Sequence, residues 1–476
     1  MHWLGLYFPD LPLEVFVRGQ SLEGPLAVTA RQGGQICILR CNEAARKLGI
    51  RAGQPLQAAL ALAGELRSWP RDLAREEEAL QALAQWAWQF SSLITFEPSL
   101  LLLEIGASLR LFGGIDALLQ RILDELPLLG YSGRWATAPN PTAAGLLARV
   151  APGSRVTTRE ALVARLERIP LARLTRDAEA RALLNDIGLG SIGDVLGLPR
   201  AELARRLGPG LLQLLDRLLG EAPDPRPPWQ PPPRFEQAIE LPAEVENGAA
   251  LIFPARRLLL SLCGFLRGQG AATQRLHWWL EYREERPPNE IEQGLLRPTR
   301  DPEHLLARFR ERLERVTLAA PVIRLGLRVD DCLPYAECSG DWLNGTGAEA
   351  EGDILERLAT RLGEQRLGGL RGRPDYRPER AVVIAPMEEG GEQPLLRGRL
   401  PLWLLHPPRP LRTADGVPQH AGPLELLRHS QRIESGWWDG EDAARDYYLA
   451  RNPAGERLWV FRDRRDGRWF LHGLFD

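Results

Sequence analysis

The first 165 residues alternate short apolar runs with amphipathic stretches, the pattern of an α/β unit. Strands are predicted over residues 3–8, 25–29, 100–105 and 133–138, and helices over 42–48, 55–63, 73–90 and 115–125. In the helix over 73–90, Leu80, Leu83 and Ala87 share one face. The run over 100–105 is apolar with almost no alternation, which predicts a strand that is buried on both faces.

Glycines punctuate the largely helical stretch over residues 178–219. Gly188 and Gly190 lie in a turn whose backbone amides could contact a DNA phosphate, as in a helix-hairpin-helix. A plain helical turn in a small bundle explains them equally well. The proline-dense segment that follows, residues 223–234, excludes helix and sheet and predicts an extended, semi-rigid spacer.

Beyond this spacer the apolar pattern predicts a ferredoxin-like βαββαβ unit. Its elements are expected over residues 235–241, 250–267, 273–282, 290–296, 302–316 and 322–329. After residue 331 the sequence becomes rich in Gly and Glu. Short aromatic runs between turn signals then predict a small β-rich module near the C-terminus. These aromatic side chains are typical of a small core, although they could also stack on bases.

With 476 residues, 44% of them hydrophobic, the chain is expected to fold into several globular domains. The formal net charge of −2 gives no overall attraction to nucleic acid, so any such affinity requires a local basic patch. No apolar run of membrane-spanning length and no signal-like start is found, and a cytoplasmic location is expected. Cys37 and Cys41 are four apart, but no second pair of Cys or His completes a zinc site.

No alternative catalytic motif is present. The seven histidines are dispersed, and the sequence has no nucleophile elbow, no phosphate-binding glycine loop with Lys-Ser/Thr and no zinc-binding His-Glu-x-x-His helix. The residues therefore favour a binding protein.

Residues 96–108, Phe-Glu-Pro-Ser-Leu-Leu-Leu-Leu-Glu-Ile-Gly-Ala-Ser, resemble a segment of the Y-family (translesion) DNA polymerases. In those enzymes an Asp-Glu pair opens the strand, and here Ser99 and Leu100 stand in its place. Residues 3–10 resemble the first palm strand, and the resemblance puts Leu6 or Tyr7 where active members have a further metal-binding Asp. Two Mg²⁺ ions about 3.5–4 Å apart require oxygen ligands, which these residues do not supply.

Two further segments carry the resemblance. Residues 41–56 resemble the fingers motif, in which Arg46 is kept and Glu43 replaces a triphosphate-binding Tyr. Residues 136–145 resemble a palm motif, with Gly145 in place of its phosphate-binding Lys. The resemblance implies that Arg46 and Asn140 are vestigial nucleotide-binding residues and that the chain holds no catalytic residue, metal or cofactor.

The resemblance also implies a domain plan. It consists of a palm and fingers over 1–165 (fingers about 11–72), a helical thumb over 166–222, the spacer over 223–234, a little finger over 235–331, a linker over 332–380 and a partner-binding region over 381–476. In the family the little finger lays its sheet in the DNA major groove. Arg256, Arg257, Arg275 and Arg283 are therefore candidate phosphate contacts, with ordinary solvated charges as the alternative.

Family members carry a short sliding-clamp peptide after the little finger. Asp341, Trp342 and Leu343 stand at that point, and Leu400, Leu402 and Trp403 form a second candidate with a better hydrophobic half. Such a peptide seats adjacent apolar side chains in a preformed pocket. Both segments could instead be ordinary packing residues.

The function that the resemblance implies is a non-catalytic adaptor in damage-induced (SOS) mutagenic translesion synthesis. Its expected partners are primer-template DNA, the β sliding clamp, an error-prone C-family DNA polymerase and a RecA-like accessory protein. One alternative is a divergent active polymerase in which Asp10 and Glu97 rebuild the metal site, although a one-residue slip on a strand turns a side chain to the opposite face. Another is a DNA-binding protein without a clamp link.

Overall fold

The computed structural model describes residues 2–19, 22–174, 182, 186, 190–283, 286–335, 358, 366, 368–385 and 400–475. The chain divides into two compact units, Met1–Gly345 and Thr346–Asp476. Each unit is described by itself.

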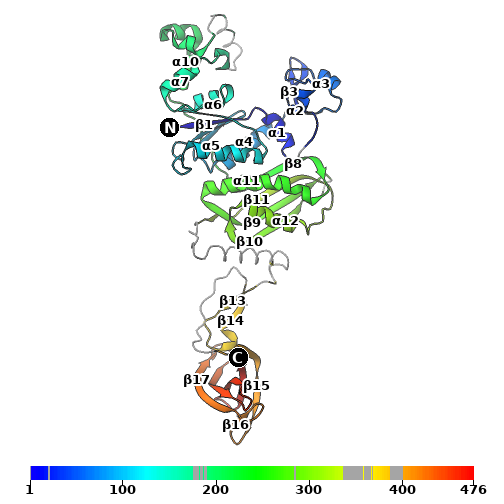
Figure 1. Cartoon of the computed structure of the whole chain (residues 1–476), viewed down its shortest axis with the longest axis vertical. Helices are drawn as coiled ribbons and strands as arrows, with labels where there is room; N and C mark the ends of the chain where they lie inside the picture. Colours follow the sequence, from blue (N-terminus) through cyan, green and yellow to red (C-terminus); the bar gives the residue numbers. More distant parts are fainter. Residues whose placement is uncertain are drawn as a thin grey trace. The chain divides into compact units, whose positions relative to one another are not determined.

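The first sheet of unit 1, the palm sheet, is antiparallel with strand order β5-β6-β1-β7. Its strands are β1 Trp3–Tyr7, β5 Ile94–Glu97, β6 Leu100–Glu104 and β7 Arg134–Ala138. Helices α4 (Leu73–Ala87) and α5 (Ile115–Leu129) cover one face, and α6 (Pro141–Val150) covers the other (Figure 1). Leu101 and Leu103 join the core on the α4/α5 face, while Leu100 and Leu102 join the core on the α6 face. The predicted burial of this strand on both faces is confirmed.

A smaller α/β lobe with its own core follows β1 and the short helix α1 (Leu11–Val17). Its sheet has the order β3-β2-β4, and helices α2 and α3 complete it. The elements are β2 Leu26–Gln32, β3 Gln35–Cys41, α2 Glu43–Lys47, α3 Leu56–Leu62 and β4 Arg67–Pro70. Asn42 caps α2 by accepting a hydrogen bond from the amide of Ala45. This lobe occupies the sequence expected for the fingers.

The helical part that follows the palm contains α7 Arg159–Leu166, the 3₁₀ turn η1 Leu171–Arg173, α9 Ile192–Leu196 and α10 Arg200–Leu219. Leu162, Ile192 and Leu215 from these helices share one buried cluster with α6 and with Leu100. The predicted helical bundle is therefore continuous with the α6 face of the palm sheet.

The proline-dense segment 223–234 forms neither helix nor strand, as predicted, but it packs along the palm. The amide of Trp229 donates to the carbonyl of Ile94 at 2.7 Å, and its indole Nε1 donates to Gln81 at 2.7 Å. The Trp229 ring also meets the edge of Trp88. The segment is a strap that is bound at several points.

The βαββαβ order predicted for the ferredoxin-like unit is confirmed, with its second and fourth strands at the centre of the sheet. The sheet has the order β10-β9-β11-β8, and helices α11 and α12 pack on one of its faces (Figure 1). The elements are β8 Phe235–Val245, the 3₁₀ turn η2 Gly248–Leu251, α11 Ile252–Gln269, β9 Ala271–Tyr282, β10 Asn289–Thr299, α12 Pro302–Leu313 and β11 Val322–Val329, with the short β12 Leu333–Pro334 added to β9. Trp278 stacks on Phe309 in the core.

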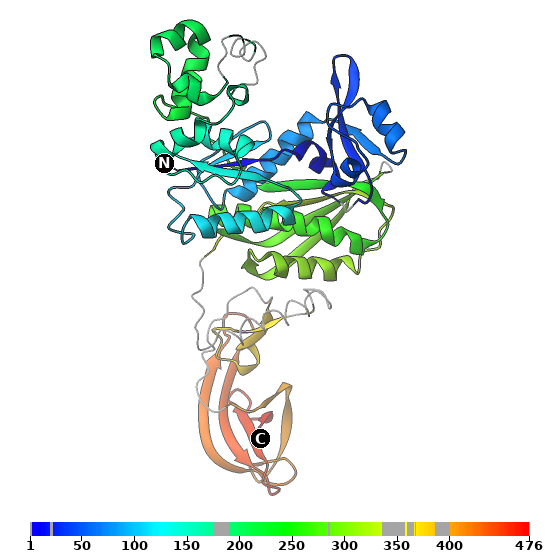
Figure 2. The same ribbon diagram turned by 45° about the horizontal axis from the view of Figure 1, so that its top comes forward.

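Helix α11 also packs against the palm helices α4 and α5, as both ribbon views show (Figure 2). Gly264 lies against the backbone of Trp86, and Gly268 lies against the ring of Trp88. Within the described residues, 248–269 is the one helical stretch long and apolar enough to cross a membrane, and 67% of its apolar window is buried. Helix α11 is apolar because it packs against the sheet of its own unit on one side and against the palm helices α4 and α5 on the other.

Unit 2 contains the predicted β-rich module, a six-stranded sheet with the order β16-β15-β20-β19-β18-β17. Its strands are β15 Trp403–Ala414, β16 Val417–Gln419, β17 Glu425–Ser435, β18 Ala443–Arg451, β19 Arg457–Asp463 and β20 Trp469–Leu474. Val460 and Trp469 belong to one buried cluster, and Tyr447 and Trp459 belong to another. A two-stranded ladder of β13 Gly369–Gly372 and β14 Val382–Ala385, with the turn η4 Pro378–Arg380, completes the described part.

Candidate functional site

The strand register resolves which residue of β1 faces the position predicted for the metal-binding acids. Tyr7 pairs directly with Leu100, and Leu6 pairs with Leu101. Directly paired residues on antiparallel strands point to the same face. Tyr7 and Leu100 therefore share the α6 face, while Leu6 is fully buried on the α4/α5 face.

Ser99 lies in the turn between β5 and β6 and adopts a left-handed φ of 57°. Its carbonyl accepts a hydrogen bond from the amide of Phe8 at 2.8 Å, so the turn is tied to the end of β1. The strands thus bring Tyr7, Ser99 and Leu100 together, while their correspondence to the metal-binding positions of the polymerases stays a prediction. They contribute a phenol, a hydroxyl and an isobutyl group to the site.

Helix α6 lies directly on this part of the sheet. A Cβ on Gly145 would lie 2.9 Å from a methyl of Leu100, and a Cβ on Gly5 would lie 2.6 Å from the carbonyl oxygen of Ala144. These distances are shorter than van der Waals contact, so the two glycines allow the helix to approach the strands. Leu100 is 0% exposed because it fills the space beneath Gly145. Hydrocarbon therefore occupies this part of the palm.

Glu97, at the end of β5, is held by two guanidinium groups. Arg149 of α6 donates to Oε2 at 2.7 Å, and Arg226 of the strap donates to Oε1 at 2.7 Å. Arg226 also donates to Thr142 and Asp224. Burial alone would raise the pKa of Glu97, but the hydrogen bonds from Arg226 and Arg149 outweigh it and lower the pKa.

The second acid proposed for a rebuilt metal site, Asp10, has different neighbours. It precedes α1 and lies 4.0 Å from Nε of Arg40, which itself donates to the carbonyl of Pro9. Asp10 and Glu97 are thus bound by separate cations. Across the described ranges, no group of three His, Cys, Asp or Glu side chains is arranged to hold a metal ion.

The two residues predicted as vestigial nucleotide contacts lie in different settings. Arg46 is exposed on α2. Asn140 caps α6 by accepting a hydrogen bond from the amide of Ala143 at 2.8 Å, and its Nδ2 donates to the carbonyl of Leu218 at 2.9 Å. Asn140 thus joins the palm to α10.

The candidate DNA contacts lie in the turn before α9, on α11, and on or directly after β9. Gly188 lies outside the described residues, and the amide of Gly190 donates to Asp194 inside a capping box. Arg256 pairs with Glu303 beside α12. Burial, with the nearby charge of Arg18, lowers the pKa of Arg257 to about 10.

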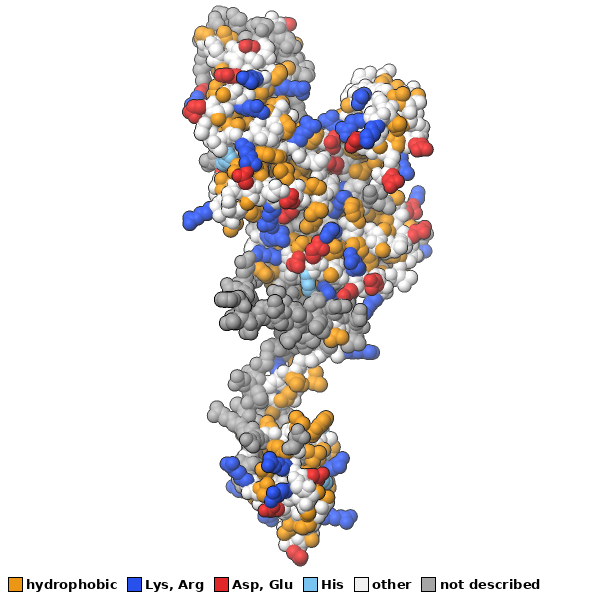
Figure 3. All heavy atoms as spheres, viewed as in Figure 1, with side chains coloured by type: hydrophobic (Ala, Val, Ile, Leu, Met, Phe, Trp, Pro, Cys, Tyr) orange, Lys and Arg blue, Asp and Glu red, His pale blue; other side chains and the backbone are white. Residues whose placement is uncertain are grey.

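Arg275 lies on β9, and Arg283 directly follows the last residue of that strand. Arg275 pairs with Glu292 at 3.2 Å, and Arg283 pairs with Glu244. Figure 3 shows acidic and basic side chains interspersed over this part of unit 1. Phosphate contacts by these arginines would have to replace existing ion pairs, and their DNA-binding role stays a prediction.

Of the two clamp-peptide candidates, Asp341, Trp342 and Leu343 lie outside the described residues. Leu402 and Trp403 are 70% and 68% exposed, and Leu400 is 40% exposed. Trp403 begins β15 and pairs with Leu474. The second candidate is therefore partly a strand end that presents exposed apolar side chains.

Sequence reasoning missed the group formed by Thr142, Arg149, Asp224 and Arg226. Arg226 and Glu97 are 129 residues apart, and the prolines around Arg226 indicated only a spacer. The one available signal was a charged residue within a proline-dense stretch.

Replacing Glu97 by Gln is expected to lower the free energy of unfolding by about 1–2 kcal/mol at pH 7, a range reduced because the carboxylate is 34% exposed. A carboxyl whose pKa is lower in the folded than in the unfolded state stabilises the fold at a pH above its unfolded-state pKa. This stabilisation is lost as the pH falls through its folded-state pKa. The difference between variant and parent should therefore shrink below about pH 4. Urea unfolding across this pH range measures it. Glu77→Gln, on an exposed face of α4, is the control, and equal losses for both variants would contradict the role of the pair.

The chain is similar to several known proteins. Residues 15–149 match the model of the impB/mucB/samB family. Among solved structures, an insertion ternary complex of Dbh DNA polymerase has 18% identity, covers 70% of this chain and all of its own, and gives a TM-score of 0.39. DinB from Sulfolobus solfataricus has 17% identity, covers 71% of this chain and all of its own, and gives a TM-score of 0.37.

The palm sheet, the helical bundle and the ferredoxin-like unit, with the family match to residues 15–149, make the chain similar to proteins of the Y-family polymerase type. Along most of its length the chain is similar to Protein ImuB of Caulobacter vibrioides, in two strains. The identity is 28% over 472 residues, which covers 90% of this chain and all of that protein. The predicted resemblance to the Y-family polymerases is thereby confirmed, and the similarity to ImuB extends over most of the chain.

Proposed function

We propose that this protein is a non-catalytic adaptor in damage-induced mutagenic translesion DNA synthesis. The observation that carries the proposal is the packing of Leu100 beneath Gly145 at the centre of the palm. A hydrated divalent cation has no oxygen ligands in this hydrocarbon, and its desolvation would not be offset. Glu97, the nearest remaining acid of the motif, is already neutralised by Arg149 and Arg226.

The adaptor binds primer-template DNA and the β sliding clamp in the cytoplasm, and it recruits an error-prone C-family polymerase and a RecA-like accessory protein. Support comes from the similarity to ImuB along 90% of the chain. The domain plan by sequence range, from palm to C-terminal region, is part of the same proposal, as is the phosphate-binding role of the little-finger arginines. The competing function is a divergent polymerase that uses Asp10 and Glu97.

Primer extension separates the adaptor from the polymerase. The purified chain, given primer-template DNA, all four nucleotides and Mg²⁺ or Mn²⁺, is expected to add no nucleotide above background. The double variant Asp10→Ala/Glu97→Ala is the matched control. Extension by the parent chain that this variant loses would establish the polymerase and end the adaptor proposal.

The same preparation tests the clamp link. The clamp is expected to bind the parent chain, and either Trp342→Ala/Leu343→Ala or Leu402→Ala/Trp403→Ala is expected to abolish this binding. Surface plasmon resonance on immobilised clamp measures the loss. A clamp that binds parent and both variants equally would remove both peptide assignments.

A further inference from the structure

Two adjacent tryptophans in unit 2 lie in solvent and not in a core. Trp437 and Trp438 are 80% and 59% exposed, and their rings meet edge to face with centroids 5.6 Å apart. They lie in the turn between β17 and β18. By contrast, Trp459 and Trp469 of the same module are 2% and 8% exposed. The aromatic run at 437–438 therefore does not contribute to the core predicted for it.

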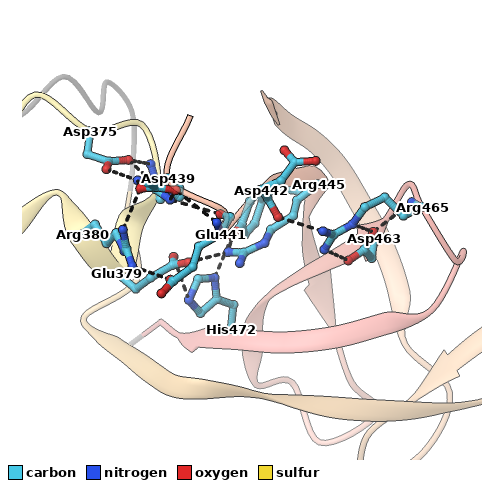
Figure 4. Close-up of polar contacts among 12 residues, drawn as sticks. Asp375, Glu379, Arg380, Asp439, Glu441, Asp442, Arg445, Asp463, Arg465 and His472 are labelled. Carbon is cyan, nitrogen blue, oxygen red and sulfur yellow. Dashed lines mark hydrogen bonds and ion pairs between the residues drawn. The ribbon is translucent and has the colours of Figure 1, made fainter. Parts of the chain in front are cut away.

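The turn that presents these rings is firmly held. Asp439 accepts hydrogen bonds from Arg377 at 2.6 and 3.0 Å, from Arg380 at 2.8 Å and from the amide of Glu441 at 3.1 Å (Figure 4). Arg377, whose side chain is 3% exposed, also binds Asp375 at 2.7 Å. These bonds tie the turn to the segment between β13 and β14. Ordering a side chain before binding reduces the entropic cost of association.

The charge around the turn is negative. Figure 4 shows four carboxylates here, Asp375, Asp439, Glu441 and Asp442. The guanidinium groups of Arg377 and Arg380 pair with the first three of them. The net charge of this group is −2, and Glu441 and Asp442 are exposed. Arg377 lies 5.9 Å from the ring centroid of Trp438, but its guanidinium is already bound to Asp375 and Asp439 and so offers little charge to the phosphates of a strand stacked on the rings. The charge thus opposes base stacking and favours a partner with basic side chains.

We propose that Trp437 and Trp438 anchor a docking surface for a folded protein that offers an apolar pocket with a basic rim. Exposed tryptophans on a turn that is held in place, within a polar rim, are typical of interface hot spots. This inference rests on the proposed function in one respect: the proteins tested for binding to this surface are the C-family polymerase and the RecA-like protein that the adaptor is proposed to recruit.

The test uses the full chain, immobilised, with purified C-family polymerase, purified RecA-like protein and a single-stranded oligonucleotide as separate probes. Trp437→Ala/Trp438→Ala is expected to weaken the binding of one of the two proteins by about 30-fold or more. Leu426→Ala/Leu427→Ala, which removes two side chains of the same module that are 40% and 41% exposed, should change it less than about threefold. Thermal unfolding checks that both variants fold.

Asp442→Lys distinguishes the class of partner without removing either tryptophan. It should weaken the binding of a protein with a basic rim and strengthen the binding of an oligonucleotide. Unchanged protein affinity in the tryptophan variant overturns the inference while the adaptor proposal stands. Loss of oligonucleotide binding alone assigns the surface to nucleic acid and also overturns it. If neither protein binds the parent chain, the inference and the recruitment part of the proposed function both fail.

Discussion

Leu100→Asp is expected to lower the free energy of unfolding by about 3 kcal/mol or more, and Mg²⁺ should not restore it. The new carboxylate would be placed beneath Gly145, where Leu100 is 0% exposed. The nearest cation of the network, Arg149, is already bound to Glu97. Urea unfolding with and without Mg²⁺ measures the effect.

Leu100→Met is the matched control, because it keeps the volume and the apolar character of the side chain. It should cost less than about 1.5 kcal/mol. If Leu100→Asp were as stable as the parent chain, or if Mg²⁺ stabilised it selectively, this part of the palm would be able to hold a cation. The inference that the packing of Leu100 beneath Gly145 by itself excludes a cation would then be wrong.

The strand over 100–105 could be predicted because burial on both faces leaves a direct signature, a run of apolar residues. The ferredoxin-like unit could equally be predicted, since its six elements keep strand and helix periodicity.

The choice between Leu6 and Tyr7 could not be predicted from the sequence. It depends on the register of β1 against β6, and a shift of one residue exchanges the two faces.

Contacts between distant segments account for most of what the sequence did not reveal. Prolines around Arg226 indicate an extended chain, but its bonds to Glu97 and Thr142 depend on where the strap lies on the palm. The exposure of Trp437 and Trp438 likewise follows from a turn held by Arg377 and not from their composition. Aromatic residues in a small module usually indicate a core. Tyr447 and Trp459 are buried as this expectation requires, whereas Trp437 and Trp438 are exposed.

The packing of α11 on the palm was also beyond the sequence, although the helix itself was predicted. Gly264 and Gly268 stand four residues apart, so they lie on one side of the helix. A glycine inside a helix normally costs stability relative to alanine. At Gly264 this cost is offset because the backbone of Trp86 occupies the position that a Cβ would take, with its carbonyl oxygen at 2.7 Å.

Gly264→Leu is therefore expected to lower the free energy of unfolding by about 2–3 kcal/mol, since backbone atoms cannot move aside as a flexible side chain can. It should also speed amide hydrogen exchange in α4 and α11, because these helices must separate. Hydrogen exchange with mass spectrometry, alongside urea unfolding, measures both effects.

Gly210→Ala in α10 is the matched control for this substitution. A Cβ there meets no atom within 4 Å, so the change should leave stability equal or raise it by up to about 1 kcal/mol through helix propensity. If Gly264→Leu behaved like this control, α11 would not be fixed to the palm helices. The ferredoxin-like unit would then be free to move away from the palm.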